Sequence, residues 1–464
     1  MTKKRTHLPV QKNERLEVTF QDLTHEGAGV AKVDGYPLFV PDALPGEKAD
    51  VKVVKTGKNF GFGRLMERHT TSTHRVDPPC PIYHWCGGCQ LQHMDQEAQL
   101  SLKREQVINA LHKYMGREDI PVQETIGMNE PWAYRNKAQV PVAERDGELI
   151  AGFFAKRSHH IVDMDHCLIQ GDQNDAAIQV VKNILKRYEI EPYDEASGRG
   201  VIRHIVARNG RLSGETMVML VTNGEELPHK KKLVEAIRSE VSGIHSIVQN
   251  INKKKTNVVY GERTEILWGE KYIEERIGKL RFALSPRSFF QVNPVQTEVL
   301  YEKVRQFAGL RGNETVIDAY CGIGSISLFL AEEARKVYGV EVIGEAISDA
   351  RKNAKLNHFP NVEFSVGKAE EVVPWWRAAL GVEADVIVVD PPRKGCDEKL
   401  LQTMIEMKPE RIIYVSCNPA TLARDLGILS DGGYEVQEVQ PVDMFPQTTH
   451  IECVTRLVRK IKER

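Results

Sequence analysis

The stretch TVIDAYCGIGSISLFLA, residues 315–331, decides the fold of the C-terminal part of this chain. It begins with a short apolar run, continues through a glycine-containing turn, and ends in an apolar segment with helical spacing. Gly322 and Gly324 allow the backbone of the turn to pass close to a ligand at the carboxyl end of the strand. The spacing differs from G-x-G-x-x-G, so a dinucleotide is not the ligand that the turn fits best. We therefore predict a strand, a ligand-binding turn and a helix.

The same alternation of strands and helices extends from about residue 287 to the end of the chain. Its apolar runs are short and are separated by helical segments, which is typical of a mostly parallel sheet covered by helices on both faces. We predict a Rossmann-like, doubly wound α/β domain over residues 286–464.

The second strand of this domain ends in Glu341, about twenty residues after the glycine turn. A carboxylate at that position can accept hydrogen bonds from ribose hydroxyls. Together with the acidic turn that contains Asp318, it suggests the S-adenosylmethionine site of a methyltransferase. The alternative for Asp318 is a carboxylate that only stabilises the turn.

Two further strands of the predicted sheet end at the same edge in residues that could take part in a reaction. The fourth strand ends in DPPR, residues 390–393, where Asp390 and two prolines form a rigid shelf beside the cofactor. Enzymes that methylate amines have an aromatic residue where this chain has Arg393, so an amine target is disfavoured. The fifth strand ends in Cys417, and the Asn-Pro pair that follows stops the strand and turns the chain. The sulfur is therefore exposed beside the cofactor, as a nucleophile requires.

Glu452 begins another strand and is a candidate base. The C5 carbon of uracil is too weak a nucleophile to attack a methyl sulfonium unaided. Addition of a thiolate to C6 makes an enolate whose charge reaches C5, which takes the methyl group before the base removes the C5 proton. The sequence thus predicts methylation of uracil C5 through an adduct between Cys417 and C6. The other C-terminal cysteines lack such a context and are predicted to be packing residues: Cys321, Cys396 and Cys453.

The N-terminal part of the chain has the pattern of a small β-barrel. Residues 14–68 contain short apolar runs separated by closely spaced Gly- and Pro-containing turns. We predict an OB-like barrel of about five strands over residues 8–68. The segment KTGKNFGFGR interleaves basic residues with Phe60 and Phe62, a composition that tracks phosphates and stacks bases. The alternative is an ordinary solvated strand edge with core phenylalanines.

Residues 69–285 are predicted to form a central α+β domain, and the helical part of residues 94–124 is expected to pack on the C-terminal domain. Four cysteines of this region could hold a metal: Cys80, Cys86, Cys89 and Cys167. The first three have the spacing C-x5-C-x2-C, and the fourth is distant. Thiolates bind zinc or an iron–sulfur cluster. The spacing favours iron–sulfur, because zinc ribbons usually carry two C-x2-C pairs, but it leaves both open.

Composition excludes some classes of protein. Lys and Arg number 63 against 64 acidic residues, so a uniformly basic nucleic-acid coat is excluded. No apolar run reaches the about 18 residues of a membrane span, and the first residues lack the apolar core of a signal peptide. We expect a monomeric cytoplasmic protein without membrane contact, in which the cysteines are reduced. The lysine runs at 229–232 and 252–255 could contact phosphates, but such runs are more often solvated faces.

Five motifs occur in the order and spacing of one family: FFQVN (289–293), DAYCGIGS (318–325), DPPRKG (390–395), SCNP (416–419) and HIEC (450–453). In them the chain resembles the bacterial RNA uracil-C5 methyltransferases, over nearly its whole length. This group includes the tRNA enzyme for thymine 54 and the 23S ribosomal RNA enzymes with an N-terminal TRAM domain. The resemblance implies S-adenosylmethionine contacts from Gln291, Tyr320, Glu341 and Asp390, with Cys417 as nucleophile and Glu452 as proton acceptor. Some relatives carry Asn in place of Ser325, so no contact is assigned to that residue.

The resemblance also implies that the barrel is a TRAM domain and that the four cysteines of the central region, Cys80, Cys86, Cys89 and Cys167, hold a [4Fe–4S] cluster. Because the tRNA enzymes of the group generally lack both features, it points to 23S ribosomal RNA as the substrate. The reaction needs no electron, so we expect the cluster to be structural or to contact RNA, with Arg75, His84 and Trp85 around it. Two alternatives stay open: the same reaction on tRNA, and a non-catalytic RNA-binding or redox-sensing protein. The presence of both Cys417 and Glu452 argues against the latter.

Overall fold

The computed structural model describes residues 8–460. These residues form two compact units. The first consists of residues 8–84, 88–106 and 447–449, and the second of residues 85–87, 107–446 and 450–460. Among the described helices, none combines the length and apolar character that a membrane span needs.

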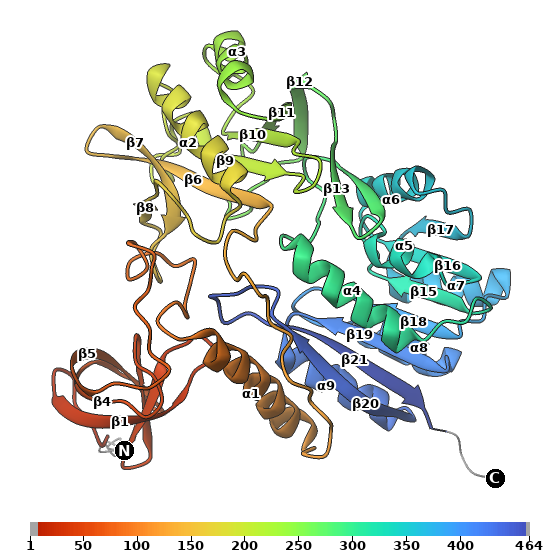
Figure 1. Cartoon of the computed structure of the whole chain (residues 1–464), viewed down its shortest axis with the longest axis horizontal. Helices are drawn as coiled ribbons and strands as arrows, with labels where there is room; N and C mark the ends of the chain where they lie inside the picture. The colour runs from red at the N-terminus through yellow and green to blue at the C-terminus, as the bar shows by residue number, and fades with distance from the viewer. Residues whose placement is uncertain (1–7, 461–464) are drawn as a thin grey trace, which may run out of the picture. The chain divides into compact units, whose positions relative to one another are not determined.

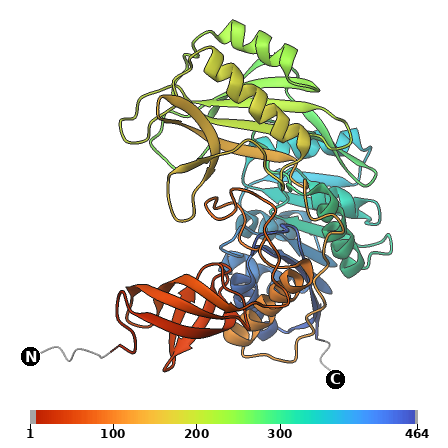
Figure 2. The ribbon, with the colours of Figure 1, turned by 60° about the vertical axis from the view of Figure 1, so that its left-hand side comes forward.

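The first unit contains a closed β-barrel, as predicted (Figures 1 and 2). Its strands are β1 (Arg15–Leu23), β2 (Gly29–Val33), β3 (Tyr36–Val40), β4 (Lys48–Thr56) and β5 (Gly61–Thr70), in the order β1-β2-β3-β5-β4. Antiparallel pairing of β1 with both β2 and β4 closes the barrel. Alternate side chains point inward, so Leu38 and Val40 of β3 and Val51 and Val53 of β4 are fully buried.

A buried carboxylate, Glu47, ties the barrel to the segment that follows it. Arg75 Nε donates to Glu47 Oε1 at 2.6 Å, and Arg68 Nε donates to Oε2 at 3.2 Å. Burial alone would raise the pKa of Glu47, but Arg75 and the amides of Leu44 and Ser72 hold it below its usual value. Arg75 is therefore bound to the barrel. The sequence does not reveal this pairing, because Glu47 is distant in the chain. That Arg75 lies at a surface that meets RNA stays a prediction.

The second unit begins with a seven-stranded sheet in the order β12-β11-β10-β9-β6-β7-β8. Its strands are β6 (Lys137–Arg145), β7 (Glu148–Phe154), β8 (Ile161–Asp163), β9 (Ile202–Asn209), β10 (Thr216–Thr222), β11 (Ile244–Ile251) and β12 (Arg263–Gly269). The helices of this region are α1 (Gln96–Met115), whose first half lies in the first unit, α2 (Asp172–Arg187) and α3 (Lys230–Glu240). Helix α2 packs on β9, and β13 (Ile273–Ile277) pairs with β14 (Leu280–Leu284) in a hairpin.

The C-terminal sheet has the order β17-β16-β15-β18-β19-β21-β20, and helices lie on both of its faces (Figure 1). Its strands are β15 (Thr315–Ala319), β16 (Lys336–Glu341), β17 (Val362–Val366), β18 (Val386–Val389), β19 (Arg411–Ser416), β20 (Tyr434–Val442) and β21 (Glu452–Arg459). Its helices are α4 (Pro294–Ala308), α5 (Ser325–Ala331), α6 (Gly344–Leu356), α7 (Ala369–Leu380), α8 (Glu398–Met407) and α9 (Pro419–Asp431). Strands β15 to β19 pair in parallel, whereas β21 is antiparallel to both of its neighbours. The predicted doubly wound, mostly parallel sheet is confirmed.

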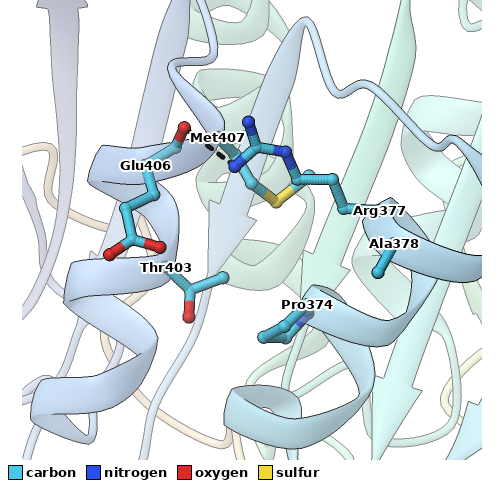
Figure 3. Close-up of a pocket in the computed structure, with 6 residues that line it drawn as sticks. All are labelled: Pro374, Arg377, Ala378, Thr403, Glu406 and Met407. Atoms are coloured by element: carbon cyan, nitrogen blue, oxygen red, sulfur yellow. Dashed lines mark hydrogen bonds between the residues drawn. The ribbon is translucent and has the colours of Figure 1, made fainter.

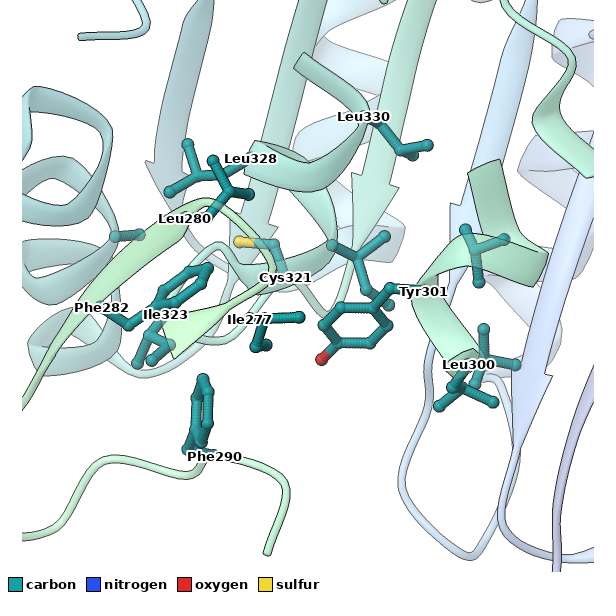
Figure 4. Close-up of a cluster of buried hydrophobic side chains, with 14 of the residues drawn as sticks. Ile277, Leu280, Phe282, Phe290, Leu300, Tyr301, Cys321, Ile323, Leu328 and Leu330 are labelled. Carbon is teal, nitrogen blue, oxygen red and sulfur yellow. The ribbon is translucent and has the colours of Figure 1, made fainter. Parts of the chain in front are cut away.

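Side chains alternate between two buried clusters on opposite faces of this sheet. Val316 and Val388 belong to the cluster that contains Leu300 of α4, part of which is drawn in Figure 4. Ile317 and Val389, the next residues along the same strands, belong to the cluster that contains residues of α7, α8 and α9. We call these the α4 face and the α9 face of the sheet. This period of two fixes the side on which each strand-end residue projects.

Candidate active site

The carboxyl edge of the C-terminal sheet gathers most of the residues that the sequence singled out. Tyr320 follows β15 directly, and Glu341 is the last residue of β16. Asp390 follows β18, and Cys417 follows β19. Because these strands are parallel, their carboxyl ends meet at one edge, where ligands of open α/β sheets bind.

Glu452 reaches the same edge because β21 runs in the opposite direction, so that its first residue lies where its neighbours end. The register pairs Ser416 with Cys453, and its continuation by one residue beyond the end of β19 would set Cys417 against Glu452. Directly opposed residues project to the same side of a sheet. Val415, two residues before Cys417, lies in the cluster of the α4 face. The thiol and the carboxyl group therefore share that face.

The Asn-Pro pair after Cys417 starts a helix, which the sequence analysis did not anticipate. Asn418 is the N-cap of α9, and its side-chain oxygen accepts from the Ala420 amide at 3.0 Å. Pro419 suits the first helical position, where an amide donor would have no partner. Cys417 is thus held between the end of a buried strand and the cap of a helix, and it is only partly exposed.

Three ionisable groups at this edge act on one another. Burial, followed by the charges of Glu452 and Asp390, raises the pKa of Cys417 to about 11, and Arg393 opposes this shift. Burial and Asp390 raise the pKa of Glu452 well above its usual value, and Arg393 again opposes. Burial raises the pKa of Asp390 to about 6. Arg393, which the sequence analysis used only as an argument against an amine target, supplies positive charge to this group.

The glycine turn and Glu341 form one hydrogen-bonded structure. Tyr320 and Gly322 adopt positive φ angles of 67° and 55°. The Gly322 amide donates to Glu341 Oε2 at 3.3 Å, and the Ile343 amide donates to Oε1 at 3.0 Å. A Cβ atom added at Gly322 would meet no atom within 4 Å. The carboxylate is thereby fixed beside open space, with lone pairs left for a ligand.

Asp318 adds a buried carboxyl group to the α4 face beneath the turn. Ser327 Oγ donates to its Oδ2, and its Oδ1 has no partner among the described residues. Burial, together with the charges of Asp390 and Glu341, raises the pKa of Asp318 to about 7. A buried carboxyl oxygen without a partner is costly, so a cationic or donor group of a ligand would satisfy it. The sequence left open whether Asp318 only stabilises the turn; here one oxygen accepts from Ser327, and the other has no partner among the described residues.

Apolar side chains are exposed next to Glu341. Val342 and Ile343 are 61% and 57% exposed, and Val366, which pairs with Glu341 across β16 and β17, is 51% exposed. Such a cluster beside a fixed carboxylate suits the planar base of a nucleoside. With Glu341 for ribose hydroxyls and Asp318 for a positively charged group, the residues present fit S-adenosylmethionine.

The FFQVN motif lies between β14 and α4 and packs against the glycine turn. Phe290 belongs to the α4-face cluster together with Cys321 of the turn (Figure 4). Gln291, the next residue, is 7% exposed. The Tyr301 hydroxyl of α4 lies 2.9 Å from Ser325 Oγ, which links α4 to the residue that follows the glycine turn. Ser325 thus has a partner within the protein.

The four cysteines of the central region are divided between the two units. Cys80 and Cys89 belong to the first unit, and Cys86 and Cys167 to the second. Within the second unit, burial raises the pKa of Cys167 to about 11, and the neighbouring Asp175 and Cys86 add smaller contributions. Cys86 and Cys167 are therefore close enough for their charges to interact.

The lysine runs contribute ion pairs on the surface of the second unit. In each run at least one lysine has a glutamate neighbour, which reduces the positive charge available to a phosphate. The pairs are Lys230–Glu265 at 3.7 Å, Lys253–Glu225 at 2.7 Å and Lys254–Glu262 at 2.6 Å.

A cavity of about 360 Å³ lies between α7 and α8 (Figure 3). Its lining consists of Pro374, Arg377, Ala378, Thr403, Glu406 and Met407. Met407 ends α8 just before β19 begins at Arg411, so the cavity is near the amino ends of the strands. It is separate from the candidate active site.

Comparison with known proteins agrees with this geometry. The profile of the tRNA (Uracil-5-)-methyltransferase family matches residues 95–460, and the TRAM domain profile matches residues 9–66. The chain belongs to the tRNA (uracil-5-)-methyltransferase family. It is thus an S-adenosylmethionine-dependent RNA methyltransferase of the uracil-5 type, with an N-terminal TRAM barrel.

Similar proteins cover the whole chain. An uncharacterized RNA methyltransferase of Halalkalibacterium halodurans is 61% identical, with 97% of this chain and 98% of the relative aligned. A second, from Bacillus cereus, is 57% identical over the same shares of the two chains. Among solved structures, the Pyrococcus abyssi tRNA (uracil-54, C5)-methyltransferase in complex with S-adenosyl-L-homocysteine is 29% identical, with a TM-score of 0.76. That match covers 96% of this chain and 100% of the other.

The affinity for S-adenosylmethionine should fall as the pH is lowered through about 7 and about 6, where the carboxyl groups of Asp318 and Asp390 take up protons. A sulfonium cation favours the ionised carboxylates, so protonation removes attraction, by up to about tenfold per pH unit for each group. Calorimetric titration between pH ~5 and ~8 measures this dependence. S-adenosylhomocysteine, whose sulfur is neutral, is the matched control. An equally steep pH dependence for both ligands would contradict the assignment.

Proposed function

We propose that the chain is a monomeric cytoplasmic enzyme that methylates C5 of a uridine in 23S ribosomal RNA, with Cys417 as nucleophile and Glu452 as proton acceptor. The observation that carries this proposal is the register of β19 against β21, which pairs Ser416 with Cys453 and so brings the neighbouring residues Cys417 and Glu452 to the ligand edge of the sheet. Asp390 acts on the pKa of both residues, which indicates that all three groups surround one space. We propose that Gln291, Tyr320, Glu341 and Asp390 contact S-adenosylmethionine there.

The two proposed catalytic residues account for each bond of the reaction. After the Cys417 thiol has lost its proton to water, the thiolate sulfur forms a bond to C6 of the uracil, and the C5–C6 π electrons move toward C5 and O4. When bound, S-adenosylmethionine supplies an electrophilic methyl group to C5 and becomes a neutral thioether. Glu452 then takes the proton from C5, the electron pair of that C–H bond restores the C5–C6 double bond, and the bond between Cys417 and C6 breaks.

Arg393 has a role in forming the nucleophile. With a pKa of about 11, the thiol of Cys417 is protonated at neutral pH in the free protein, and thiolate is the reactive form. Arg393 is a cation that lowers this pKa, so it stabilises the thiolate. We propose that the same guanidinium stabilises the negative charge that develops on the uracil ring after addition.

Replacing Cys417 with Ala should abolish methylation, because no adduct can form, and should change the affinity for S-adenosylmethionine by less than about threefold. Replacing Glu452 with Gln should instead let addition and methyl transfer proceed and then stop, since an amide cannot accept the C5 proton. Denaturing gel electrophoresis with labelled RNA should therefore show an accumulated protein–RNA adduct for Glu452→Gln and none for Cys417→Ala. Methylation by the Cys417→Ala variant would exclude the nucleophile assignment.

The choice of 23S ribosomal RNA rests on the resemblance of the barrel and the cysteine motif to ribosomal RNA enzymes. Transfer RNA is the second candidate, because the Pyrococcus abyssi enzyme that matches this chain is described as acting on uracil 54 of tRNA. A match over 96% of this chain has to include most of the barrel. The barrel by itself therefore does not exclude a tRNA substrate.

Purified enzyme should transfer a labelled methyl group to 23S ribosomal RNA isolated from cells that lack this protein. It should leave a tRNA transcript of the same cells unlabelled, because the barrel and the cysteine motif together resemble those of ribosomal RNA enzymes. Mass spectrometry of the labelled RNA identifies the uridine, and the Cys417→Ala variant controls for contaminating activity. Labelling of tRNA alone would replace the first candidate with the second.

We propose that the barrel binds RNA through an aromatic cluster formed by Phe39, Phe60 and Phe62. Phe39 and Phe62 are directly paired across β3 and β5, and their rings lie 6.0 Å apart. Phe60 stacks on Phe39 at 5.3 Å and meets Phe62 edge-on at 5.6 Å. Since Leu38 and Val40 point into the barrel, the rings are on its outer surface, and Phe60 is 43% exposed. Exposed rings beside lysines suit base stacking better than the core role that the sequence left open.

We propose that Cys80, Cys86, Cys89 and Cys167 hold a [4Fe–4S] cluster. Support comes from their sequence spacing and, within the second unit, from the electrostatic contact of Cys86 with Cys167. Soft thiolate donors suit iron–sulfur clusters and zinc alike. The proposed reaction involves no electron transfer, so the cluster would have a structural role.

Protein prepared without oxygen should contain about four irons per chain and should absorb visible light as iron–sulfur proteins do. Replacing Cys167 with Ser should reduce the iron content, whereas replacing the buried Cys453 with Ser should leave it unchanged. Metal analysis by mass spectrometry provides the measurement. Zinc in place of iron would contradict the cluster.

A further inference from the structure

The loop that contains Arg393, residues 391–397, is anchored on one face of helix α9. We call it the anchored loop. Asn418 Nδ2 and Thr421 Oγ1 both donate to the backbone carbonyl of Arg393, at 3.0 Å and 3.3 Å. One helical turn further on, Arg424 Nη2 donates to the next carbonyl of the loop at 3.0 Å. Residues three apart lie on the same side of a helix. The helix that begins beside the proposed nucleophile thus holds the loop that carries the cation.

Asp425 accepts hydrogen bonds from the anchored loop, from β19 and from α9 itself. Its side chain is fully buried, and its Oδ2 accepts from the Cys396 amide of the loop at 2.8 Å and from the Tyr414 hydroxyl at 2.5 Å. Its Oδ1 accepts from Arg424 Nε at 2.7 Å. Tyr414 belongs to β19, the strand that ends at the nucleophile, and projects to the α9 face. One carboxylate therefore joins the loop, the strand and the helix.

The glycine of the DPPRKG motif allows the loop to approach this carboxylate. Gly395 has a φ of 82°, which side chains rarely adopt. A Cβ atom there would lie 2.6 Å from Asp425 Oδ2 and 2.5 Å from Arg424 Nη2. At the far end of the loop, the Asp397 amide donates to the Tyr320 hydroxyl at 3.4 Å, which links the loop to the cofactor turn. The motif is thus shaped to fit α9 as well as to carry Asp390.

We propose that Asp425 is a positioning residue that fixes the anchored loop on α9 and so sets the distance between the Arg393 guanidinium and the Cys417 sulfur. The inference rests on the proposed function, in which that sulfur is the nucleophile. Asp425 lies on the α9 face, whereas Cys417 and Glu452 share the α4 face, so it acts through the loop and not on the substrate. Because the attraction between a cation and a thiolate falls with distance, a loosened loop gives a less reactive sulfur.

The test measures the pKa of Cys417 in the full-length protein. The rate at which iodoacetamide alkylates Cys417 is followed against pH, with mass spectrometry of the peptide that contains it. Asp425→Asn, which keeps the size of the side chain but removes its charge, should raise this pKa and lower the methylation rate about tenfold or more. The KM for S-adenosylmethionine should change by less than about threefold, since its proposed contacts lie elsewhere. Tyr414→Phe, which removes one hydroxyl, should act in the same direction more weakly, and it tests the proposal if Asp425→Asn does not fold.

Tyr434→Phe is the matched control. The Tyr434 hydroxyl is also buried and donates to the Pro409 carbonyl at 3.0 Å, but this bond lies just before β19 begins, at the amino end of the strand. It should lower thermal stability about as much as Tyr414→Phe without shifting the pKa of Cys417. If Asp425→Asn and Tyr414→Phe likewise lower stability and leave that pKa unchanged, Asp425 is only structural and the proposal is overturned.

A second comparison tests whether the effect passes through Arg393. In an Arg393→Gln background, Asp425→Asn should produce no additional shift in the pKa of Cys417, because the cation that it positions is gone. An undiminished shift in that background would overturn the proposal. These outcomes are distinct from a failure of the proposed function, which would show as methylation by the Cys417→Ala variant.

Discussion

The antiparallel insertion of β21 between β19 and β20 is the constraint on which the candidate active site depends. If β21 ran parallel to β19, its first residue would lie at the opposite edge of the sheet from Cys417. Reversal of the strand brings Glu452 to the edge where its neighbours end, and the ladder of backbone hydrogen bonds fixes it there. Because a slip of one residue would turn every side chain to the other face, the register also decides that the carboxyl group and the thiol meet.

Burial of carboxyl groups at this edge has an electrostatic consequence. Asp318, Asp390 and Glu452 all have raised pKa values because they are removed from water, and the charge of Asp390 adds to the shifts of Asp318 and Glu452. The sheet holds this unfavourable arrangement through packing on both faces. Under the proposed function, a cationic ligand would stabilise these carboxylates, so that the site would favour a sulfonium over a neutral thioether. Arg393 balances part of the charge from the loop after β18.

Much of the fold and the position of the candidate site could be predicted from the sequence, because buried parallel strands have a distinctive pattern. Cys417 and Asp390 were placed at one sheet edge on that basis alone. The direction of β21 could not be predicted in this way. A buried apolar strand has the same sequence pattern whether it pairs with its neighbour in parallel or antiparallel. Asp425 was missed because an aspartate within an amphipathic helix looks like a solvated residue. Only the packing of the loop on α9 shows that it is buried.

In the barrel, too, contacts between segments that are distant in the chain could not be predicted from the sequence. Phe60 and Phe62 were noted from their neighbouring lysines and arginine, whereas Phe39 was not. The alternation in β3 would have indicated that Phe39 faces outward, but the parallel pairing with β5 that joins it to Phe62 is not a local property of the sequence. Arg75 was assigned to RNA because it lies near the cysteine motif, and its partner Glu47 lies in a different turn of the chain.

The left-handed backbone of Tyr320 has a bearing on how the cofactor turn and the anchored loop are joined. A residue with a side chain is strained at a φ of 67°, and a glycine would relieve that strain. The tyrosine offsets this strain, because its ring packs against the α9-face cluster and its hydroxyl accepts from the Asp397 amide at 3.4 Å. A glycine at this position would lose both contacts, so the tyrosine couples the shape of the cofactor turn to the position of the anchored loop.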